Sequence, residues 1–202
     1  THTAQGSFSA TNAHLDLYNN LESDTDQKGS IITFTDNYYG GGSYNKTTRA
    51  GIKGGTDDDI ITITASGKGD ADTIDGHTHG GSGDTLALST GTHTFSDNNK
   101  LKGIEIITTH SSGSTVVLTG QNEVFTINGG AGKDYITGGG GVDTISTGNN
   151  QDTITGGAGD DIITGGSGND TFNIDSGTDT VNDLTTGDVF VVSAGATLNA
   201  IN

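Results

Sequence analysis

A nine-residue period constrains this chain more than any other feature of its sequence. Counted from Gly129, the period produces seven consecutive phrases: GGAGKDYIT, GGGGVDTIS, TGNNQDTIT, GGAGDDIIT, GGSGNDTFN, IDSGTDTVN and DLTTGDVFV. The sixth position is always Asp, at Asp134, Asp143, Asp152, Asp161, Asp170, Asp179 and Asp188. The eighth is always a large apolar residue, at Ile136, Ile145, Ile154, Ile163, Phe172, Val181 and Phe190. Two columns aligned over seven phrases identify an internal repeat, which decides the fold.

The phrase is too short for a helical hairpin, and its one apolar position is flanked by Thr, Ser or Asn. A strand of three residues with the middle one pointing inward fits this pattern. The six residues before it must then reverse the chain, and Gly at positions one, two and four permits the positive φ angles that tight turns need. Two phrases therefore predict one flattened coil of eighteen residues. Such coils stack as two parallel sheets with strands about 4.8 Å apart, an all-β solenoid.

Stacking also predicts two columns of like charge. Asp134, Asp152, Asp170 and Asp188 would share one edge of the solenoid, and Asp143, Asp161 and Asp179 the other. Like charges repel by about 1 kcal/mol at 4 Å in water, and by more where water is excluded. Ca²⁺ removes this conflict because it takes six to eight oxygens from carboxylates and backbone carbonyls. Residues 129–188 contain ten Asp and one Lys, a net charge of -9, so about five Ca²⁺ ions would nearly neutralise them.

Four phrases, GGAGKDYIT, GGGGVDTIS, GGAGDDIIT and GGSGNDTFN, fit the pattern G-G-x-G-x-D-x-U-x at every defined position, where U is a large apolar residue. The chain thereby resembles the repeat-in-toxin (RTX) family of calcium-binding nonapeptide repeats. The resemblance implies a parallel β-roll with Ca²⁺ between stacked turns, and export by a bacterial type I secretion system. It also implies a fold switched by calcium, unfolded where Ca²⁺ is scarce and folded at extracellular millimolar concentrations.

In that family, turn carbonyls join the Asp carboxylates around each ion. The resemblance implies carbonyl ligands at the odd positions Gly129, Ala131, Gly138, Gly140, Gly156 and Ala158. It implies even-position ligands at Gly148, Gly157, Gly159, Gly166, Gly168 and Gly177, with Asn150 in place of a fourth-position Gly. Asn is a suitable replacement because it enters left-handed conformations more readily than most residues.

The period weakens upstream of Gly129. Counting backwards in nines places Phe125 and Val116 in the Asp column, and Ile127 and Leu118 in the apolar column. Two phrases further upstream fit the frame, GGTDDDIIT at 54 and GKGDADTID at 67, with Asp59 and Asp72 at position six. Both Asp are candidate calcium ligands, so further Ca²⁺ ions are expected upstream of the regular repeats. Residues 91–110 interrupt the repeat, although LKGIEII within them resembles a strand stacked on the same sheets.

We expect five segments. They are a β-rich N-terminal cap or lead-in at 1–50, irregular repeats at 51–90, interrupting strands at 91–119, the regular β-roll at 120–190, and a C-terminal strand or tail at 191–202. Alternating stretches such as SIITFTDNYY support strands in the first segment.

Composition excludes several classes of function. The 202 residues contain 25 acids against eight Lys and Arg, a net charge of -17, and no clustered basic residues, which argues against nucleic acid as a partner. No apolar run approaches 18 residues, so no membrane-spanning helix is expected. The absence of Cys excludes disulfides and thiolate metal sites. No HExxH or GxSxG motif is present, so we do not expect an enzyme.

Three alternatives depend on other residues. A zinc site is conceivable from His77, His79, His93 and His110, although their spacing fixes no metal geometry. DTDQKGS at 24 begins like an EF-hand loop but lacks its Glu, which leaves a loose acidic calcium site from Glu22, Asp24 and Asp26. Outward Thr residues beside the apolar column would suit an ice-binding surface, but Tyr135, Ile162, Asn173 and Asn182 interrupt them.

These features predict a calcium-dependent structural module of a secreted bacterial cell-surface protein, most consistent with a surface-layer protein that self-associates into a lattice. A segment of an RTX adhesin, which attaches to cells or surfaces, is the main alternative, with a cell-surface glycan or lipopolysaccharide as partner. The repeat region of a secreted toxin or hydrolase, and an ice-binding solenoid, are further alternatives. The preference for a surface-layer protein is an analogy of fold and composition.

Overall fold

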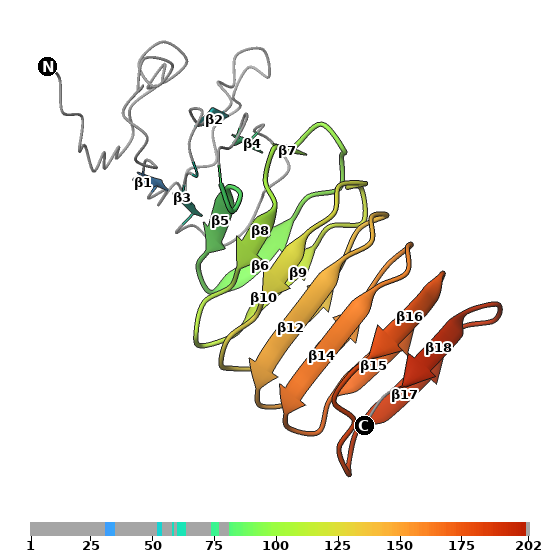
Figure 1. Ribbon diagram of the computed structural model, residues 1–202. Helices are drawn as coiled ribbons and strands as arrows, with labels where there is room; N and C mark the ends of the chain where they lie inside the picture. Colours follow the sequence, from blue (N-terminus) through green and yellow to red (C-terminus); the bar gives the residue numbers. More distant parts are fainter. Residues whose placement is uncertain are drawn as a thin grey trace, which may run out of the picture.

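The computed structural model describes residues 31–34, 52–53, 58, 60–63, 74–76 and 81–200. Every regular element in these residues is a β-strand. The strands are paired in parallel throughout and follow one another along one direction, so that successive coils are stacked (Figure 1). The prediction of an all-β parallel solenoid is confirmed.

Two long sheets form the walls of the solenoid. The nine-stranded sheet contains, in spatial order, β1 (Ile31–Phe34), β3 (Ile60–Ile63), β5 (Thr85–Leu88), β8 (Ile106–Thr108), β10 (Thr126–Asn128), β12 (Thr144–Asn149), β14 (Ile162–Ser167), β16 (Thr178–Val181) and β18 (Thr197–Ala200). The six-stranded sheet contains β17 (Val189–Val192), β15 (Thr171–Ile174), β13 (Thr153–Thr155), β11 (Tyr135–Thr137), β9 (Ser114–Val117) and β6 (Gly91–Thr94). A third, short sheet contains β2 (Ile52–Lys53), β4 (Ile74–Asp75) and β7 (Leu101–Lys102).

The register of the two long sheets shows the eighteen-residue coil directly. In the nine-stranded sheet Thr126 pairs with Thr144, and Thr144 pairs with Ile162. In the six-stranded sheet Tyr135 pairs with Thr153, and Thr153 pairs with Thr171. Consecutive phrases therefore alternate between the two sheets, and phrases eighteen residues apart lie directly on one another.

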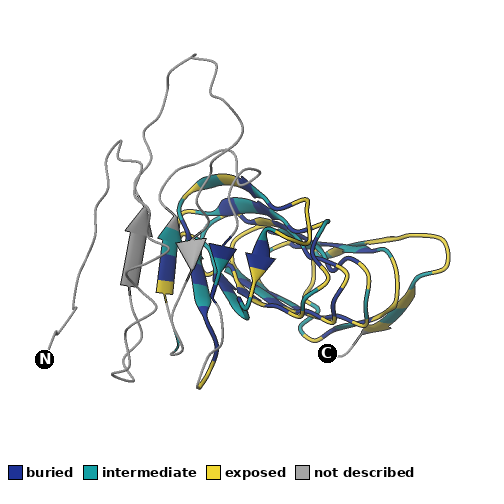
Figure 2. Cartoon of the chain, turned by 90° about the horizontal axis from the view of Figure 1, so that it is seen from above, coloured by how far each residue is buried: buried dark blue, intermediate teal, exposed yellow. Residues whose placement is uncertain are grey.

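The eighth-position side chains fill the space between the sheets. Those from Ile136 to Val181 are at most 1 % exposed, and Figure 2 shows the described coils as flattened loops with buried residues along the strands. Burial of one such side chain contributes about 1.5–3 kcal/mol. Phe190 is only half-buried, but its ring stacks on Phe172 with centroids 5.2 Å apart, so the apolar column continues to β17.

Upstream of β10 the structure corrects the predicted frame. Val116 pairs with Ile136 and thus lies in the apolar column, while the backbone of Ser114 meets the carboxylate of Asp134. The expected place of Val116 in the Asp column is therefore wrong. The reason is a turn between β9 and β10 that is two residues longer, so the coils are twenty residues apart here. Leu118 is buried as expected, but it lies in this longer turn, after β9.

Residues 100–117 also keep the nine-residue frame, so the interruption expected at 91–110 does not extend beyond residue 99. Ile107 pairs with Ile127 in the apolar column, and the side chain of Glu105 accepts a hydrogen bond from the backbone N–H of Asp84 at 2.8 Å. Glu105 thus takes the sixth position, and the strand expected in LKGIEII is β8. The remaining segment boundaries stay predictions. Within 1–50, only the backbone of β1 lies among the described residues, where it pairs with β3.

Candidate metal centre

Two files of buried carboxylates run along the edges of the solenoid. The first file consists of Asp134, Asp152, Asp170 and Asp188, and the second of Asp143, Asp161 and Asp179. Each file is built as a ladder in which Oδ1 of one Asp accepts a hydrogen bond from the backbone N–H of the Asp one coil earlier. The N–H of Asp134 meets Asp152 at 2.8 Å, and the N–H of Asp143 meets Asp161 at 2.8 Å. Sequence neighbours therefore lie on opposite edges, as the alternation of phrases predicts.

The second oxygen of most of these carboxylates has no partner. Oδ2 is buried without a hydrogen bond at Asp134, Asp152, Asp161, Asp170 and Asp179. A buried carboxylate oxygen without a donor is costly, since it has lost its water and gained nothing in exchange. Such atoms in a periodic row indicate that another group, a cation or ordered water, belongs beside them.

Burial and mutual repulsion make the files hard to ionise. Desolvation, together with repulsion from the neighbouring Asp152, raises the pKa of Asp134 to about 6. Desolvation raises the pKa of Asp161 to about 7, with added repulsion from Asp143 and Asp179. The pKa values of Asp143, Asp152, Asp170 and Asp179 are raised as well, in each case mainly by desolvation. A divalent cation at this position would reverse the effect by favouring the ionised form.

The first-position glycines leave space beside the orphaned oxygens. A Cβ atom on Gly129 would lie 3.0 Å from Oδ2 of Asp134, and one on Gly165 would lie 2.6 Å from Oδ2 of Asp170. A Cβ on Gly156 would clash with Oδ2 of Asp161. Gly therefore keeps open a space next to the carboxylate that any other residue would fill.

The turns are also stacked so closely that their carbonyls approach the next coil. Gly157 has a φ of 105°, and a Cβ there would clash with the carbonyl oxygen of Gly139. Asn150 stands where most phrases have a fourth-position Gly, and its φ of 81° is the left-handed conformation expected at that position. Carboxylate oxygens, turn carbonyls and open space together fit Ca²⁺, which prefers hard oxygen ligands. Within the described residues no three His, Asp or Glu side chains form a group that could hold a metal ion by themselves.

Some of the carbonyls predicted as ligands already accept hydrogen bonds. The carbonyl of Gly129 accepts one from the Thr109 hydroxyl, that of Gly157 from the Ser176 hydroxyl at 3.1 Å, and that of Gly177 from the Thr197 N–H at 3.1 Å. The carbonyl of Gly168 accepts the Thr185 hydroxyl at 3.4 Å. Gly148 and Gly166 lie near the ends of β12 and β14, and the other predicted carbonyls lie between strands, at Ala131, Gly138, Gly140, Asn150, Gly156, Ala158 and Gly159. A carbonyl has two lone pairs, so one hydrogen bond does not prevent a carbonyl from binding a cation.

The sequence prediction missed polar side chains in the turns. Thr147 replaces a first-position Gly, and its hydroxyl donates to the carbonyl of Gly165 at 3.0 Å. Asp183 also replaces a first-position Gly and accepts hydrogen bonds from the N–H groups of Gly165 and Gly166. Their only sequence signal is their place in the period, where a Gly is expected.

The first file ends at Asp188 without an orphaned oxygen. Its Oδ1 accepts the N–H of Asp170 at 2.8 Å, and its Oδ2 accepts the N–H of Thr185 at 2.7 Å. Asp188 is also less buried than the other members of its file. The support for a cation is therefore weaker between Asp170 and Asp188 than between the inner members.

The other candidate sites are only partly covered. Asp59, Asp72, His77 and His79 lie outside the described residues, as do Glu22, Asp24 and Asp26. His93 is buried, and its Nε2 lies 2.9 Å from the carbonyl of Ser89, whereas His110 is exposed and accepts the N–H of Ser112 at 3.1 Å. These two histidines have separate partners and form no common site in the described part.

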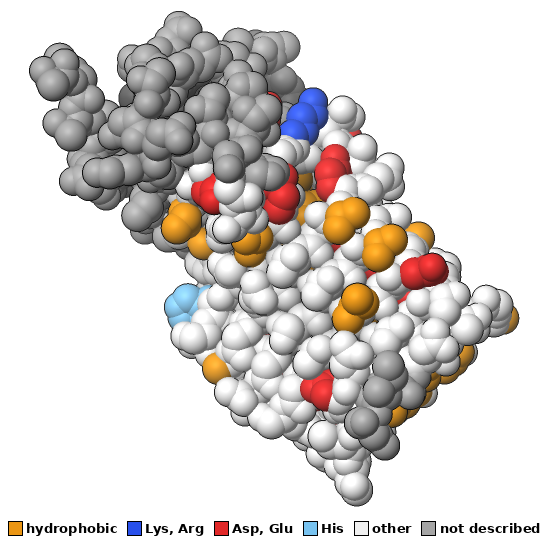
Figure 3. Space-filling view, in the orientation of Figure 1, with side chains coloured by type: hydrophobic (Ala, Val, Ile, Leu, Met, Phe, Trp, Pro, Cys, Tyr) orange, Lys and Arg blue, Asp and Glu red, His pale blue; other side chains and the backbone are white. Residues whose placement is uncertain are grey.

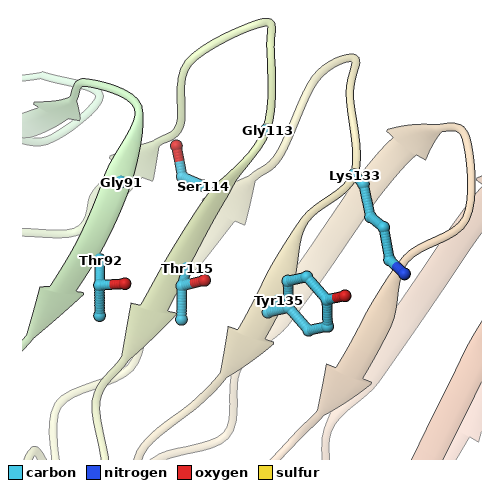
Figure 4. Close-up of a pocket in the computed structure, with 7 residues that line it drawn as sticks. All are labelled: Gly91, Thr92, Gly113, Ser114, Thr115, Lys133 and Tyr135. Atoms are coloured by element: carbon cyan, nitrogen blue, oxygen red, sulfur yellow. The ribbon is translucent and has the colours of Figure 1, made fainter.

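The outer face of the six-stranded sheet carries a shallow groove of about 180 Å³. It is lined by Gly91, Thr92, Gly113, Ser114, Thr115, Lys133 and Tyr135, with the Tyr135 ring lying alongside the strands (Figure 4). The Nζ atom of Lys133 lies 5.0 Å from the centre of that ring, a cation–π contact. The groove adjoins the first carboxylate file, because the N–H of Ser114 in its lining donates to Oδ1 of Asp134 at 2.8 Å.

Comparison with known proteins bears on the files directly. The RTX calcium-binding nonapeptide repeat family, described by four copies of the repeat, matches residues 126–154 and 146–181. These residues hold six of the seven file members, all except Asp188. No curated protein and no solved structure matches the chain.

Proposed function

Since residues 126–181 of this chain are RTX calcium-binding nonapeptide repeats, we propose that the chain is a calcium-dependent structural module of a bacterial surface-layer protein. RTX repeats bind calcium and are typical of secreted proteins. The observation that carries the proposal is the row of buried Oδ2 atoms without partners along both edges of the solenoid. In this proposal the ions lie between stacked turns and link each coil to the next, and the chain has no catalytic role.

The residues of the chain divide the work of holding an ion. Consecutive Asp of one file supply carboxylate oxygens from two coils, and the glycine turns supply carbonyls and the open space. Bound Ca²⁺ supplies the positive charge that cancels repulsion within the file. Because the ligands come from different coils, binding and folding are coupled, and extracellular calcium at millimolar concentration would drive folding by mass action.

A calcium titration followed by far-UV circular dichroism tests the folding switch. The full chain, started in chelator at low salt and pH 7.5, should gain β signal over about 0.1–10 mM Ca²⁺. Mg²⁺ at equal concentration should not replace it, because Mg²⁺ demands a tighter octahedral site and loses its water reluctantly. Full β signal in chelator would contradict the proposal.

The surface of the solenoid supports assembly between copies. The face in Figure 3 is mostly uncharged, with hydrophobic side chains in separate spots, because the file carboxylates point inward. Val124 is 62 % exposed and Val142 is 50 % exposed. Val191 and Val192, on strand β17 at the end of its sheet, are each 52 % exposed. Single exposed apolar side chains are normal on a protein surface, so Val191 and Val192, which are consecutive on a terminal strand, are the residues proposed to contact a second copy.

Electron microscopy after calcium addition tests the lattice. Ordered two-dimensional arrays are the expected result, and replacement of Val191 and Val192 by Lys should abolish them while the calcium-induced circular dichroism persists. Soluble monomers at all calcium concentrations would exclude a surface-layer role.

None of the described residues form a helix long and apolar enough to cross a membrane.

The groove beside Tyr135 favours a second candidate, an RTX adhesin segment. An exposed aromatic ring next to hydroxyl groups and a cation suits the face of a sugar ring, so a cell-surface glycan would be the ligand. A glycan array probed with the calcium-loaded chain tests this, with Tyr135→Ala as the variant and Tyr135→Phe as the control that keeps the ring. If no glycan binds, the adhesin candidate is excluded and the surface-layer proposal remains.

A further inference from the structure

The turn that contains Gln121 differs chemically from the turns below it. The Gln121 side chain is fully buried, and its Nε2 donates to two carbonyl oxygens of the turn above, that of Phe95 at 3.2 Å and that of Asp97 at 2.6 Å. These carbonyls are two residues apart on one turn, the same spacing as the carbonyl pair of Gly138 and Gly140 that is expected to face an ion. An amide NH₂ group has two hydrogens and can satisfy both carbonyls at once.

Uncharged groups also join these two turns at a second point. The N–H of Asn122 donates to Oδ1 of Asn98 at 2.6 Å, beside the two bonds from Gln121. The turns are as close as those in the regular repeats, since a Cβ on Gly120 would clash with the carbonyl of Ser96. We call this contact, between residues 95–98 and 120–123, the Gln121 junction.

The column of carboxylates is also interrupted at this junction, between Glu105 and Asp143. Phe125 takes the place of the Asp and is 1 % exposed. Its N–H donates to Oδ1 of Asp143 at 2.8 Å, and Oδ2 of Asp143 accepts the N–H of Gly139 at 3.1 Å. Both oxygens of the first Asp in the second file are thus satisfied by the protein, unlike Oδ2 of Asp161 and Asp179.

The opposite edge of the solenoid is closed in a similar way. The N–H of Ser114 donates to Oδ1 of Asp134 at 2.8 Å. The hydroxyl of Thr109 has two acceptors within reach of its one proton, this oxygen at 3.1 Å and the carbonyl of Gly129. Donors from the preceding coil therefore satisfy Oδ1 of Asp134, whereas its Oδ2 has no hydrogen-bond partner.

We propose that Gln121 replaces a cation at this junction, so that the coils around residues 95–128 stay ordered without calcium and serve as the platform on which residues 129–190 fold when calcium binds. The inference rests on the proposed calcium-dependent folding of the downstream coils. The apolar side chains around the junction, Phe95, Leu118 and Phe125, are all buried and supply its cohesion.

The amide orientation follows from its surroundings. Turning the amide over would place Oε1 against two carbonyl oxygens, which repel it, so Nε2 must face them. Oε1 is buried without a partner among the described residues. A water on this atom is compatible with the proposal, whereas a calcium ion there would contradict it.

Hydrogen exchange followed by mass spectrometry on the full chain tests the platform. In excess chelator, peptides within 115–127 should exchange at rates within about threefold of those in 10 mM Ca²⁺, while peptides within 134–181 should exchange at least about a hundredfold faster. If peptides within 115–127 lose as much protection in chelator as peptides within 134–181, the platform proposal is wrong. Protection of 134–181 that does not depend on calcium would overturn the proposed function instead.

Two variants test the role of Gln121 itself. Gln121→Glu removes the donor and adds a carboxylate beside the two carbonyls. It should therefore bind one more calcium per chain by native mass spectrometry, and protection of 115–127 should become calcium-dependent. Gln121→Met, which has neither donor nor charge, should lose that protection in both conditions and keep the wild-type calcium number. Loss of one calcium in Gln121→Met would show that Oε1 of the wild-type residue binds an ion, and this would refute the proposal. The proposal would also be refuted if Gln121→Glu left both the calcium number and the protection of 115–127 unchanged.

Discussion

Replacement of Asp161 by Asn tests the carboxylate files most directly. Asp161 is the central member of the second file: its Oδ1 accepts the N–H of Asp143 at 2.8 Å, and its own N–H donates to Asp179 at 3.1 Å. Asn keeps the shape and the Oδ1 acceptor but removes the charge. The variant therefore separates electrostatics from packing.

The expected effect changes sign with calcium. Asp161 stands between the two pairs that would bind ions, Asp143/Asp161 and Asp161/Asp179. A site with a dissociation constant of about 1 mM contributes about 1.4 kcal/mol at 10 mM Ca²⁺, so weakening two sites should lower the free energy of unfolding by about 3 kcal/mol. In chelator, where the wild-type coils are largely unfolded, the variant should keep at least as much β signal as the wild type, because desolvation raises the pKa of Asp161 to about 7 and its charge opposes folding at pH 7.5.

Urea unfolding at pH 7.5 in 10 mM CaCl₂ measures the first effect, and the far-UV circular dichroism signal that remains in chelator measures the second. The matched control is Asp160→Asn, because Asp160 is adjacent in sequence but exposed, and it accepts the N–H of Thr178 at 2.7 Å, a bond that Asn can keep. The control should change stability by less than about 0.5 kcal/mol in either condition. An Asp161→Asn variant that is destabilised in calcium and also shows less β signal than the wild type in chelator would refute the electrostatic argument.

Three further predictions concern pH, the core and a turn. Burial raises the pKa of Asp134 to about 6 and that of Asp161 to about 7, so the folded chain binds protons more tightly than the unfolded chain. In chelator the thermal stability of the chain should therefore fall as pH rises from about 4 to about 7. A rise in thermal stability over this range would contradict the buried files. Ile154→Ala should cost about 2–5 kcal/mol in calcium by urea unfolding, and Phe190→Ala less because that side chain is half-buried; equal losses would argue against a continuous buried column. Gly157→Ala should cost about 1–3 kcal/mol from backbone strain alone, since its φ is 105°, and a neutral thermal melt would disprove the turn geometry.

The sequence predicted the regular coils because their two columns are chemically distinctive. Asp at every sixth position and an apolar residue at every eighth fix the eighteen-residue register from residue 126 onward, and the paired strands have this register. The alternation of file members between the two edges followed from the same count. The ladder from backbone N–H to Oδ1 did not, because it depends on the distance between coils.

Upstream, the prediction failed where the sixth position lost its Asp. Glu105 and Ser114 occupy that position, and the turn between β9 and β10 has two extra residues, so counting in nines from Gly129 went out of register. A search that accepted Glu would have found KLKGIEIIT in frame. The role of Gln121 has no such signal, since its partners lie 24 and 26 residues away in a turn of irregular length.

The eighteen-residue coil also has a mechanical consequence. Each coil advances the stack by only about 4.8 Å, whereas its eighteen residues span about 60 Å when fully extended. A coil peeled from the stack under tension would therefore lengthen the chain more than tenfold over its folded contribution, and returning calcium could fold it back. A surface protein built this way would yield to shear in steps of one coil and recover its length afterwards.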